Sequence, residues 1–569
     1  MNFVSRWGNR PYNCYSAVFH PTDSEVLYAA IEAGGSVNGI WRSGDSGQTW
    51  EQLTAGMPSG ELLGRISLAI SPSHPDILYA LASSRGRRVI GVFRTDDGGQ
   101  SWVDTAGTTF VKEGQLAYNS AIAVHPEDPD IVICGAQNLF RTVNGGTKWE
   151  QISQNDPTDT STAYVHADQH AILMSGGNLS AGMLVYSAND GGIAISRDLG
   201  TTWDSSSRGM ATIQFYEADV SPGNGDVFGG GTQDNGTLLA GVTNGVGLQT
   251  GRKNRRDFVR VVAGDGGYVV FDPGNVERVY ASSLGADMSM HTPGRRWAKG
   301  ESPTAWNNIT PPEISKAEKS QRALTVLAIE PGANRRGRKL FLGTYRLWMW
   351  TLIDLRWQPA SQFGFDGSSI SAIEISPVDT NLMFVGTSNG GVFRSRDGGA
   401  NWSADLSGPE IPSVVITDIR THPTDSNVVA VAVASTGAQA AVLEGHDRPF
   451  SHVFLSSDYG KIWDDIDGGK LPNVVFTSLE YETHEPYRLL AAGDAGPWIF
   501  EPESGWISLA GAIPNVVISD IFYHDKDRTL TAATYGRGMW RTRLPRKLKI
   551  EPPDKNVLPK RDLPPKLRR

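Results

Sequence analysis

The chain has 569 residues, of which 64 are glycine, 16 are tryptophan and only two are cysteine. This length exceeds what one hydrophobic core usually serves, and abundant glycine with little helical periodicity favours an all-β chain over a helical one. The formal net charge of −9 argues against a nucleic-acid-binding surface, and no apolar run is long enough for a transmembrane helix.

A short turn pattern recurs six times along the chain. It consists of Ser or Thr, Asp or Asn two residues later, Gly after four and Trp after seven, at 43–50, 95–102, 142–149, 196–203, 395–402 and 456–463. The Asp or Asn can accept hydrogen bonds from nearby backbone N–H groups, and the Gly can adopt the positive φ of a tight turn. The Trp opens the next strand and covers the hairpin with a large ring. Each copy, called a staple below, predicts a β-hairpin.

Each staple lies inside a longer repeat. The order is an apolar strand, a turn that is often His-Pro, a second strand, a polar turn, a third strand, the staple and a fourth strand. The end of the first strand is marked at Pro21, Pro72, Pro126, Pro222, Pro273, Pro331, Pro377 and Pro423, with weaker versions near Ser175, His484 and Asp525. Eleven four-stranded units at intervals of roughly 50 residues predict the blades of a β-propeller.

Eleven blades exceed the usual ring of four to eight, so two rings are expected, with one larger ring as the alternative. A polar, Pro-containing stretch at 310–320 suggests a first propeller region at 1–311 with six repeats and a second at 312–545 with five. Residues 2–7 are expected to close the second ring beside residues 537–543, because an unpaired edge strand invites aggregation.

Residues 546–569 form a basic tail with nine Lys or Arg, three Asp or Glu and five Pro. Such a segment is expected to be extended and mobile, and it could contact an acidic partner or remain solvated. The basic insertion at 243–257 predicts an exposed loop. Cys14 and Cys134 lie two units apart, so neither a disulfide nor a metal site is expected. No signal peptide is evident; a bacterial extracellular or periplasmic location is suspected.

The loops before the first strands and between the second and third strands of propeller blades open on one face. Three units should bring a polar set to one mouth: His166, Asp168, His170, Asn189, Asp190, Gln233, Asp234, Asn235 and Asp265. Corresponding turns carry Tyr345, Arg346, Tyr535 and Arg537. Convergent polar groups in a concave site are the usual candidates for ligand binding. Asp or Asn beside Gly also has a purely structural reading, since turns favour these residues.

His166, Asp168 and His170 alternate, so an extended strand would place them on one side. A metal site needs more ligands in defined geometry, so no metal or other cofactor is predicted.

The staples resemble the Asp-box or BNR repeat, and the chain from about residue 10 to 545 resembles the propeller superfamily that includes sialidases, the sortilin-type receptors and the two-propeller xyloglucanases of glycoside hydrolase family 74. Its recurring phrases at 231–236, 264–267 and 533–540 are similar to those of the last two groups. The resemblance implies a propeller with a peptide-binding tunnel or a glucan-binding cleft. The chain lacks an ordered sialidase set, since Arg94, Arg141 and Arg394 lie beside staples, and it has eleven units where the xyloglucanases have about fourteen.

Two functions are therefore expected. The first is a non-catalytic scaffold or recognition protein that binds a glycan, peptide or protein partner through the channel-face loops. Such a protein does not bind nucleic acid and can be a component of a larger assembly. The alternative is a xyloglucanase-like endo-β-glucanase, whose acid and base would be Asp234 and Asp265, with Asp168 next. Sugar stacking would then need exposed aromatic rings. Trp306, Trp348, Trp350 and Trp357 are available, although core packing explains them equally.

Overall fold

The structure, a computed structural model, describes residues 13–546 except for gaps at 33–34, 59–62, 107–109, 111–112, 157–158, 160, 178–182, 205–209, 242–257, 276–277, 284–286, 292–305, 315–324, 333–336, 362–363, 435–450, 503, 510 and 512. The chain divides into two compact units, Met1–Ile213 and Gln214–Arg569. Its described residues are almost entirely β-structure, with one short 3-10 helix (η2, Gly35–Val37) and no α-helix. Nothing among them has the length and apolar character that a membrane-spanning helix requires.

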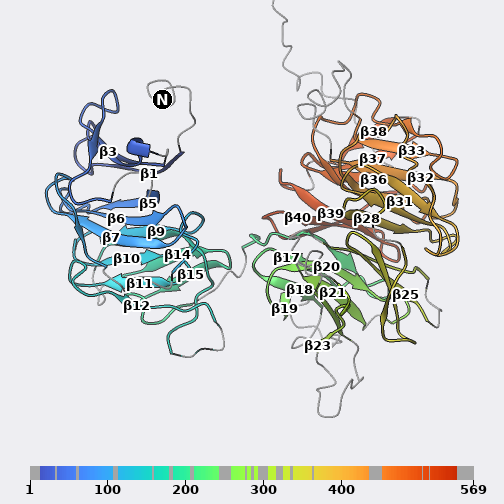
Figure 1. Ribbon diagram of the computed structural model, residues 1–569, viewed down its shortest axis with the longest axis horizontal. Helices are drawn as coiled ribbons and strands as arrows, with labels where there is room; N and C mark the ends of the chain where they lie inside the picture. The colour runs from blue at the N-terminus through green and yellow to red at the C-terminus, as the bar shows by residue number, and fades with distance from the viewer. Residues whose placement is uncertain are drawn as a thin grey trace, which may run out of the picture. The chain divides into compact units, whose positions relative to one another are not determined.

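The first unit contains four antiparallel sheets in chain order, drawn in blue to teal in Figure 1. The first sheet has β1 (Asn13–Phe19), β2 (Leu27–Glu32), β3 (Gly39–Ser43) and β4 (Glu51–Leu53), and the second has β5 (Leu63–Ile70), β6 (Leu78–Ser84), β7 (Val89–Thr95) and β8 (Val103–Asp104). The third has β9 (Ala121–Val124), β10 (Val132–Gly135), β11 (Leu139–Thr142) and β12 (Glu150–Gln151), and the fourth has β13 (Gln169–Met174), β14 (Val185–Asn189) and β15 (Gly192–Ser196).

The second unit contains seven antiparallel sheets, drawn in green to red in Figure 1. The first four are β16 (Asp219–Val220), β17 (Phe228–Thr232), β18 (Gly236–Ala240) and β19 (Phe258–Val262); β20 (Gly266–Phe271), β21 (Val279–Ser283), β22 (Met288–His291) and β23 (Trp306–Asn308); β24 (Val326–Ile329), β25 (Lys339–Gly343), β26 (Leu347–Thr351) and β27 (Trp357–Pro359); and β28 (Ile370–Ile375), β29 (Met383–Thr387) and β30 (Val392–Ser395). The last three are β31 (Ile416–Thr421), β32 (Val429–Val433), β33 (Val453–Ser456) and β34 (Asp464–Asp465); β35 (Phe476–Tyr481), β36 (Leu489–Gly493), β37 (Gly496–Glu501) and β38 (Gly505–Ser508); and β39 (Ile518–His524), β40 (Thr529–Thr534) and β41 (Met539–Arg543).

These eleven sheets confirm the predicted all-β propeller fold. In each unit, the first strand of one sheet packs against the first strand of the next, so that the sheets succeed one another like blades. In the second unit β39 of the last sheet also contacts β16 of the first, and the succession of seven sheets closes on itself.

The division between the units lies at residues 213 and 214, whereas the sequence suggested a boundary near 311. That stretch falls between β23 and β24, where the contact between β20 and β24 continues the same succession of sheets. A polar, Pro-containing linker is therefore compatible with two blades of one unit. Residues 2–7, the insertion at 243–257 and the tail from 547 lie outside the described residues.

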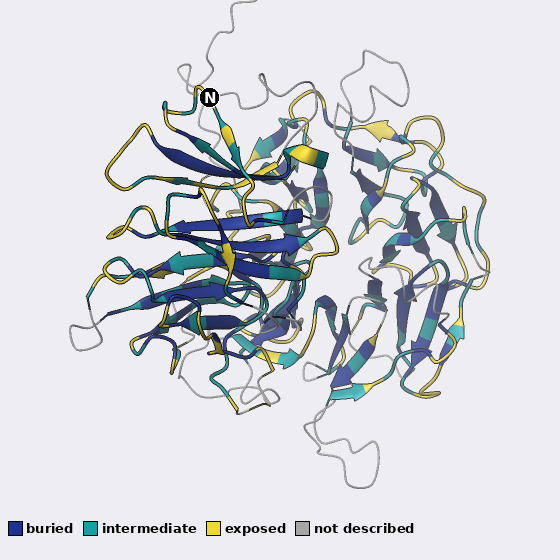
Figure 2. Ribbon diagram, turned by 60° about the vertical axis from the view of Figure 1, so that its left-hand side comes forward, coloured by how far each residue is buried: buried dark blue, intermediate teal, exposed yellow. Residues whose placement is uncertain are grey.

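The interfaces between sheets form the core. One side of each sheet packs against the next; Tyr28 and Ile40 of the first sheet, for example, meet Leu68 and Phe93 of the second. In Figure 2 the buried positions follow the strands, and the exposed ones gather in the connecting turns. Cys14 is exposed, Cys134 is buried, and both are free thiols.

The staples fold as their sequence predicts. In all six, the side chain of the Asp or Asn accepts a backbone N–H four residues later, at 2.8 to 3.0 Å. The Gly has positive φ in every copy, for instance 84° at Gly47. Hydrogen bonds, chiefly from the side chains of Thr49, Ser101 and Asn401, lower the pKa of Asp45, Asp97 and Asp397 to about 2. These aspartates are therefore turn residues.

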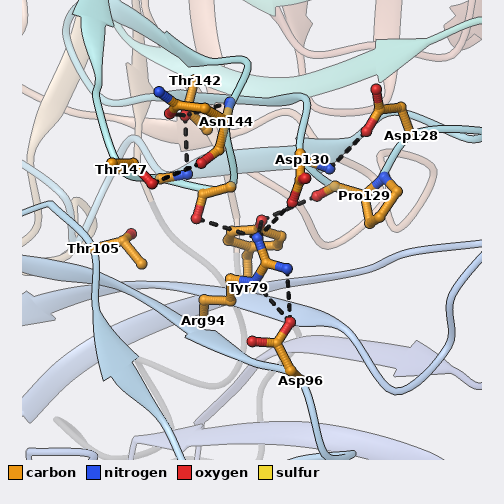
Figure 3. A network of polar contacts seen from close by, with 12 residues as sticks. Tyr79, Arg94, Asp96, Thr105, Asp128, Pro129, Asp130, Thr142, Asn144 and Thr147 are labelled. Atoms are coloured by element: carbon orange, nitrogen blue, oxygen red, sulfur yellow. Dashed lines mark hydrogen bonds and ion pairs between the residues drawn. The ribbon is translucent and has the colours of Figure 1, made fainter.

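The arginines beside the staples tie neighbouring sheets together. Arg94 donates to Asp130 Oδ1 at 2.7 Å and to the carbonyl oxygen of Gly145 in the next staple, and it also bonds Tyr79 and Asp96 (Figure 3). Arg141 and Arg394 donate in the same way to the carbonyl oxygens of Leu199 and Tyr459, each at 2.7 Å. The three guanidinium groups thus have structural partners.

Candidate functional site

The second unit brings together residues that are about three hundred positions apart in the sequence. The hydroxyl of Tyr535, in the β40–β41 turn, donates to Gln233 Oε1, in the β17–β18 turn, at 2.5 Å. The ring of Tyr535 lies 6.1 Å from that of Tyr216, and its side chain is 41% exposed. Burial and, secondarily, the charge of Asp234 raise the pKa of the Tyr535 phenol. We call Tyr216, Gln233, Asp234, Asp265 and Tyr535 the mouth of the second unit.

Two of the mouth aspartates hold turns. The carboxylate of Asp265 accepts the backbone N–H of Asp234 at 2.7 Å, and Asp234 has a φ of +58°. Asn235 donates through its backbone and its side chain to the carbonyl oxygen of Gln233. The structural reading of Asp or Asn beside Gly therefore applies here.

The remaining predicted turn residues of the second unit lie as expected between second and third strands. Arg346 follows β25 and its guanidinium lies 5.3 Å above the ring of the buried Trp348. Tyr345 precedes it in the turn, and its carbonyl oxygen accepts the N–H of Gly364. Arg537 is exposed in the β40–β41 turn. Their participation in one binding site stays a prediction.

A second polar cluster lies in the first unit. Asp190, in the β14–β15 turn, accepts a hydrogen bond from His170 Nε2 at 2.6 Å and one from the Tyr118 hydroxyl at 3.2 Å. The rings of Tyr118 and His170 meet edge to face, 5.0 Å apart. The hydrogen bond to Asp190 raises the pKa of His170. Asn189, beside Asp190, accepts the N–H of Gly191 and holds the turn.

The expected alternation of His166, Asp168 and His170 along one strand is wrong. β13 begins at Gln169, and Asp168 has a φ of +66°, which turns the chain just before the strand. Asp168 instead accepts a hydrogen bond from Asn119 and has a pKa raised by burial and by the charge of Asp190. His166 packs against Gly191, where any added Cβ would lie 2.6 Å from the His166 side chain. The meeting of the predicted site residues at a single mouth stays a prediction.

The sequence did not predict the carboxyl groups that line the centre of the second unit. The first strands of its seven sheets enclose a cavity of about 350 Å³. Six acidic side chains line it, together with Arg420 and Tyr268; we call the six the hub carboxyls: Glu217, Asp219, Glu374, Asp418, Glu480 and Asp520. First strands were expected to be nearly all apolar, but five of them (β16, β28, β31, β35 and β39) carry an acidic residue that lines the cavity.

Most hub carboxyls connect consecutive sheets. Asp219 accepts the backbone N–H of Phe271, and Glu374 accepts that of Thr421, at 2.7 and 2.8 Å. Asp418 and Asp520 accept the N–H groups of Leu479 and Ala218, at 2.8 and 3.1 Å. In each case the donor belongs to the next sheet around the ring. These four carboxyls thus link neighbouring blades through side-chain to backbone hydrogen bonds.

Burial dominates the electrostatics of the hub. It raises the pKa of Asp219 and Glu480 to about 8, and that of Asp418 to about 7 in spite of the Arg420 guanidinium 2.8 Å away. Asp418, Glu480 and Glu374 share the Arg420 guanidinium, so repulsion between the carboxylates adds to the cost of burying them. The signal in the sequence is an acidic residue three or five positions before the proline, as in Glu374 before Pro377 and Asp418 before Pro423.

The tryptophans considered for sugar stacking belong mostly to the core. Trp348, Trp350 and Trp357 are buried in the contact between the β20–β23 and β24–β27 sheets, and Trp306 is half-buried. The exposed aromatic rings near the predicted residues are instead Tyr535 in the second unit and Tyr118 in the first.

No protein-family model and no curated protein matches this chain in sequence. Among solved structures, it is similar to the GH74 xyloglucanase from Xanthomonas campestris, with 13% identity and a TM-score of 0.27 over 94% of this chain and 100% of that one. It is also similar to a GH74 enzyme from Niastella koreensis (13% identity, TM-score 0.28, 93% of this chain and 90% of that one) and to an extracellular domain from B. thetaiotaomicron (11%, 0.41, 93% and 64%). At these values the likenesses carry no conclusion about this chain, and the β-propeller fold is argued from its own sheets.

Proposed function

We propose that this chain is a non-catalytic recognition protein that binds a glycan, peptide or protein partner through the mouth of the second unit. The observation that carries the proposal is the hydrogen bond between Tyr535 and Gln233, which holds an exposed aromatic ring beside polar turns. An aromatic face next to amide and carboxylate groups suits a sugar ring or an apolar side chain with polar neighbours.

Binding can be tested by screening the purified chain on arrays of immobilised oligosaccharides and peptides. We expect at least one ligand whose binding is lost in Tyr535→Ala and weakened in Gln233→Ala. Ile462→Ala is the control, because Ile462 is a large, 64% exposed side chain in a staple of the same unit. A ligand bound equally by Tyr535→Ala, or one lost in Ile462→Ala, contradicts the mouth as the binding site.

The glucanase alternative rests on different features. A glycosidase needs two carboxyl groups across the sugar, one of them with a raised pKa. Asp168 has a raised pKa, whereas Asp265 uses its carboxylate to hold the Asp234 turn. Release of reducing sugar from xyloglucan that Asp234→Asn, Asp265→Asn or Asp168→Asn abolishes would support the hydrolase; no release by the wild-type protein contradicts it.

A further inference from the structure

The two end sheets of the first unit each leave one side exposed. β1, the first strand of the first sheet, is exposed at five of its seven residues, and β13, the first strand of the last sheet, is exposed at His170, Ala171 and Leu173. Among the residues that the structure describes, the first strands of the other nine sheets contain no exposed position. The second unit closes its succession of sheets into a ring, whereas the first unit presents two exposed end strands.

The exposed side of the last sheet is apolar. Residues paired in neighbouring antiparallel strands share one side of a sheet. The strand register therefore groups six side chains, which we call the forward face: Ala171, Leu173, Tyr186, Ala188, Ile193 and Ile195. Leu173 is 66% exposed, and none of the six is buried. On the opposite side of the sheet, Met174 and Val185 pack against the third sheet. A contiguous apolar surface of this kind marks an interaction site.

The second unit buries the corresponding face of its sheets. In the sheet of β28–β30, Phe384 and Val392 occupy the positions of Tyr186 and Ile193, counted from the serine that opens each staple. Phe384 and Val392 are both 0% exposed, because they pack against the sheet of β31–β34. The forward face therefore has the composition and register of a contact between blades.

A tyrosine at the position of Tyr186 also bonds to the following sheet. Tyr28 and Tyr79 hold this position in the first and second sheets, where each pairs with the residue before the staple. Their hydroxyl groups donate to the carbonyl oxygens of Gly98 and Pro129 in turns of the next sheet, each at 3.0 Å. Tyr186 therefore places the same kind of donor on the exposed side of the last sheet.

The exposed side of β1 is the counterpart that a preceding blade would cover. Ala17 and Phe19 share this side, which we call the rear face, and Phe19 is 65% exposed. In the sheet of β31–β34, the same register positions are held by Ile419 and Thr421, which are 0% and 4% exposed. Ile419 packs against the preceding sheet, and the N–H of Thr421 donates to Glu374 of that sheet at 2.8 Å. The first sheet therefore has the surface by which a blade contacts its predecessor.

The two faces match each other position by position. Glu374 of β28 corresponds by register to Leu173, and Thr421 of β31 corresponds to Phe19. Because Glu374 and Thr421 are in contact, a forward face packed against a rear face would place Leu173 beside Phe19. Their contact would remove two large apolar side chains from water. Each chain thus carries both halves of one blade contact.

We propose that two copies of this chain close one ring of eight sheets, in which the forward face of each first unit packs against the rear face of the other. The contact is made twice about a twofold axis, so the ring has no open side. Four sheets from each copy give a ring within the usual range of four to eight blades, and a third copy would exceed that range. This inference does not depend on the proposed binding function.

Light scattering coupled to size-exclusion chromatography of the full chain tests this arrangement. The wild-type protein at micromolar concentrations is expected at about 123 kDa, twice the 61.5 kDa of one chain. Leu173→Glu alters the forward face and Phe19→Glu alters the rear face, and each should give about 61.5 kDa because a buried, unpaired charge opposes the contact. Since both side chains are already exposed in the single chain, circular dichroism should show that the two variants remain folded.

Two control variants place the same charge elsewhere. Val143→Glu, in a staple of the first unit, and Ile353→Glu, in the second unit, alter side chains that are 56% and 69% exposed, and both should keep the mass of two chains. A wild-type protein that remains at the mass of one chain overturns the proposal, and so does one that forms open assemblies of larger mass. A dimer that persists in either face variant, or that is lost in either control, also overturns it.

Discussion

Replacing Asp219 by Asn should change how the stability of the second unit depends on pH. Asp219 lies on β16, is 7% exposed and accepts the N–H of Phe271 on β20 at 2.7 Å. Burial raises its pKa from 3.8 to about 8, and the two backbone donors only partly oppose this shift. An asparagine keeps a carbonyl oxygen for Phe271 and never ionises.

The magnitude follows from the size of the shift. A difference of about four pKa units at about 1.4 kcal/mol each corresponds to roughly 5 kcal/mol between the protonated and ionised forms. Because the folded-state pKa is raised, the folded protein retains a proton that the unfolded chain releases above about pH 4. The free energy of unfolding therefore falls by about 1.4 kcal/mol for each pH unit between about pH 4 and the folded pKa of about 8, and it levels off above that value.

Urea denaturation of the full chain between pH 5 and pH 9 measures this effect. Between pH 5 and pH 9, the free energy of unfolding of Asp219→Asn should rise relative to that of wild type by roughly 3–5 kcal/mol. Asp464→Asn, which alters an exposed carboxylate on β34, should follow the wild-type profile. Parallel profiles for wild type and Asp219→Asn over this range would refute the reasoning.

Three further predictions concern the staples and their partners, which we call the rim of the blades. Trp463 is buried, and its indole N–H donates to the carbonyl oxygen of Leu406 at 2.8 Å. Measured by urea denaturation, Trp463→Ala should therefore lower the free energy of unfolding by roughly 3–5 kcal/mol, and Trp463→Phe should lower it less. Equal losses in the two variants would contradict a packing role for the aromatic ring. The pKa of Asp397 is lowered to about 2 chiefly by the Asn401 side chain, so the stabilisation that ionised Asp397 provides is present above pH 4 and is lost as the pH falls towards 2. In Asp397→Asn, the melting temperature should therefore fall less steeply between pH 4 and pH 2 than in wild type. An unchanged fall would contradict the stabilising role of this aspartate in the staple. Arg141→Ala removes the hydrogen bond to the Leu199 carbonyl oxygen, and hydrogen exchange at 196–203 should accelerate, whereas Arg197→Ala, at an exposed position, should leave it unchanged.

The staples could be predicted because their chemistry is local. All of the atoms that define the turn at 43–50 lie within eight residues, and the hydrogen bond from Thr49 to Asp45 needs no other part of the fold. The same holds for the turns of Asp190, Asp234 and Tyr535, whose positions between second and third strands followed from the repeat. Each of these turns lies within one repeat, so its position could be predicted from the sequence of that repeat alone.

The hub could not be predicted because it depends on the order of the sheets around the ring. The carboxylate of Asp520 is satisfied by an amide at Ala218, some three hundred residues earlier. Alternation along a first strand shows that Glu217 and Asp219 share one side of the chain, but it does not tell whether that side faces solvent or a cavity. The boundary between the two units could not be predicted from the polar composition of residues 310–320. It depends on which sheets pack against each other, and this is not visible in one segment of the sequence.

Rim and hub place the same residue type in opposite environments. At the rim, exposed aspartates such as Asp45 accept donors within their own turn, and their pKa falls to about 2. In the hub, Asp219 and Asp418 are taken out of water beside other carboxyls, and their pKa rises to about 8 and about 7. Rim hydrogen bonds therefore weaken as acid protonates the staples, whereas the contacts between blades weaken as alkali removes hub protons. Because the two effects act at different radii of one blade, acid should first loosen the hairpin ends, and alkali should first separate the sheets at their centre.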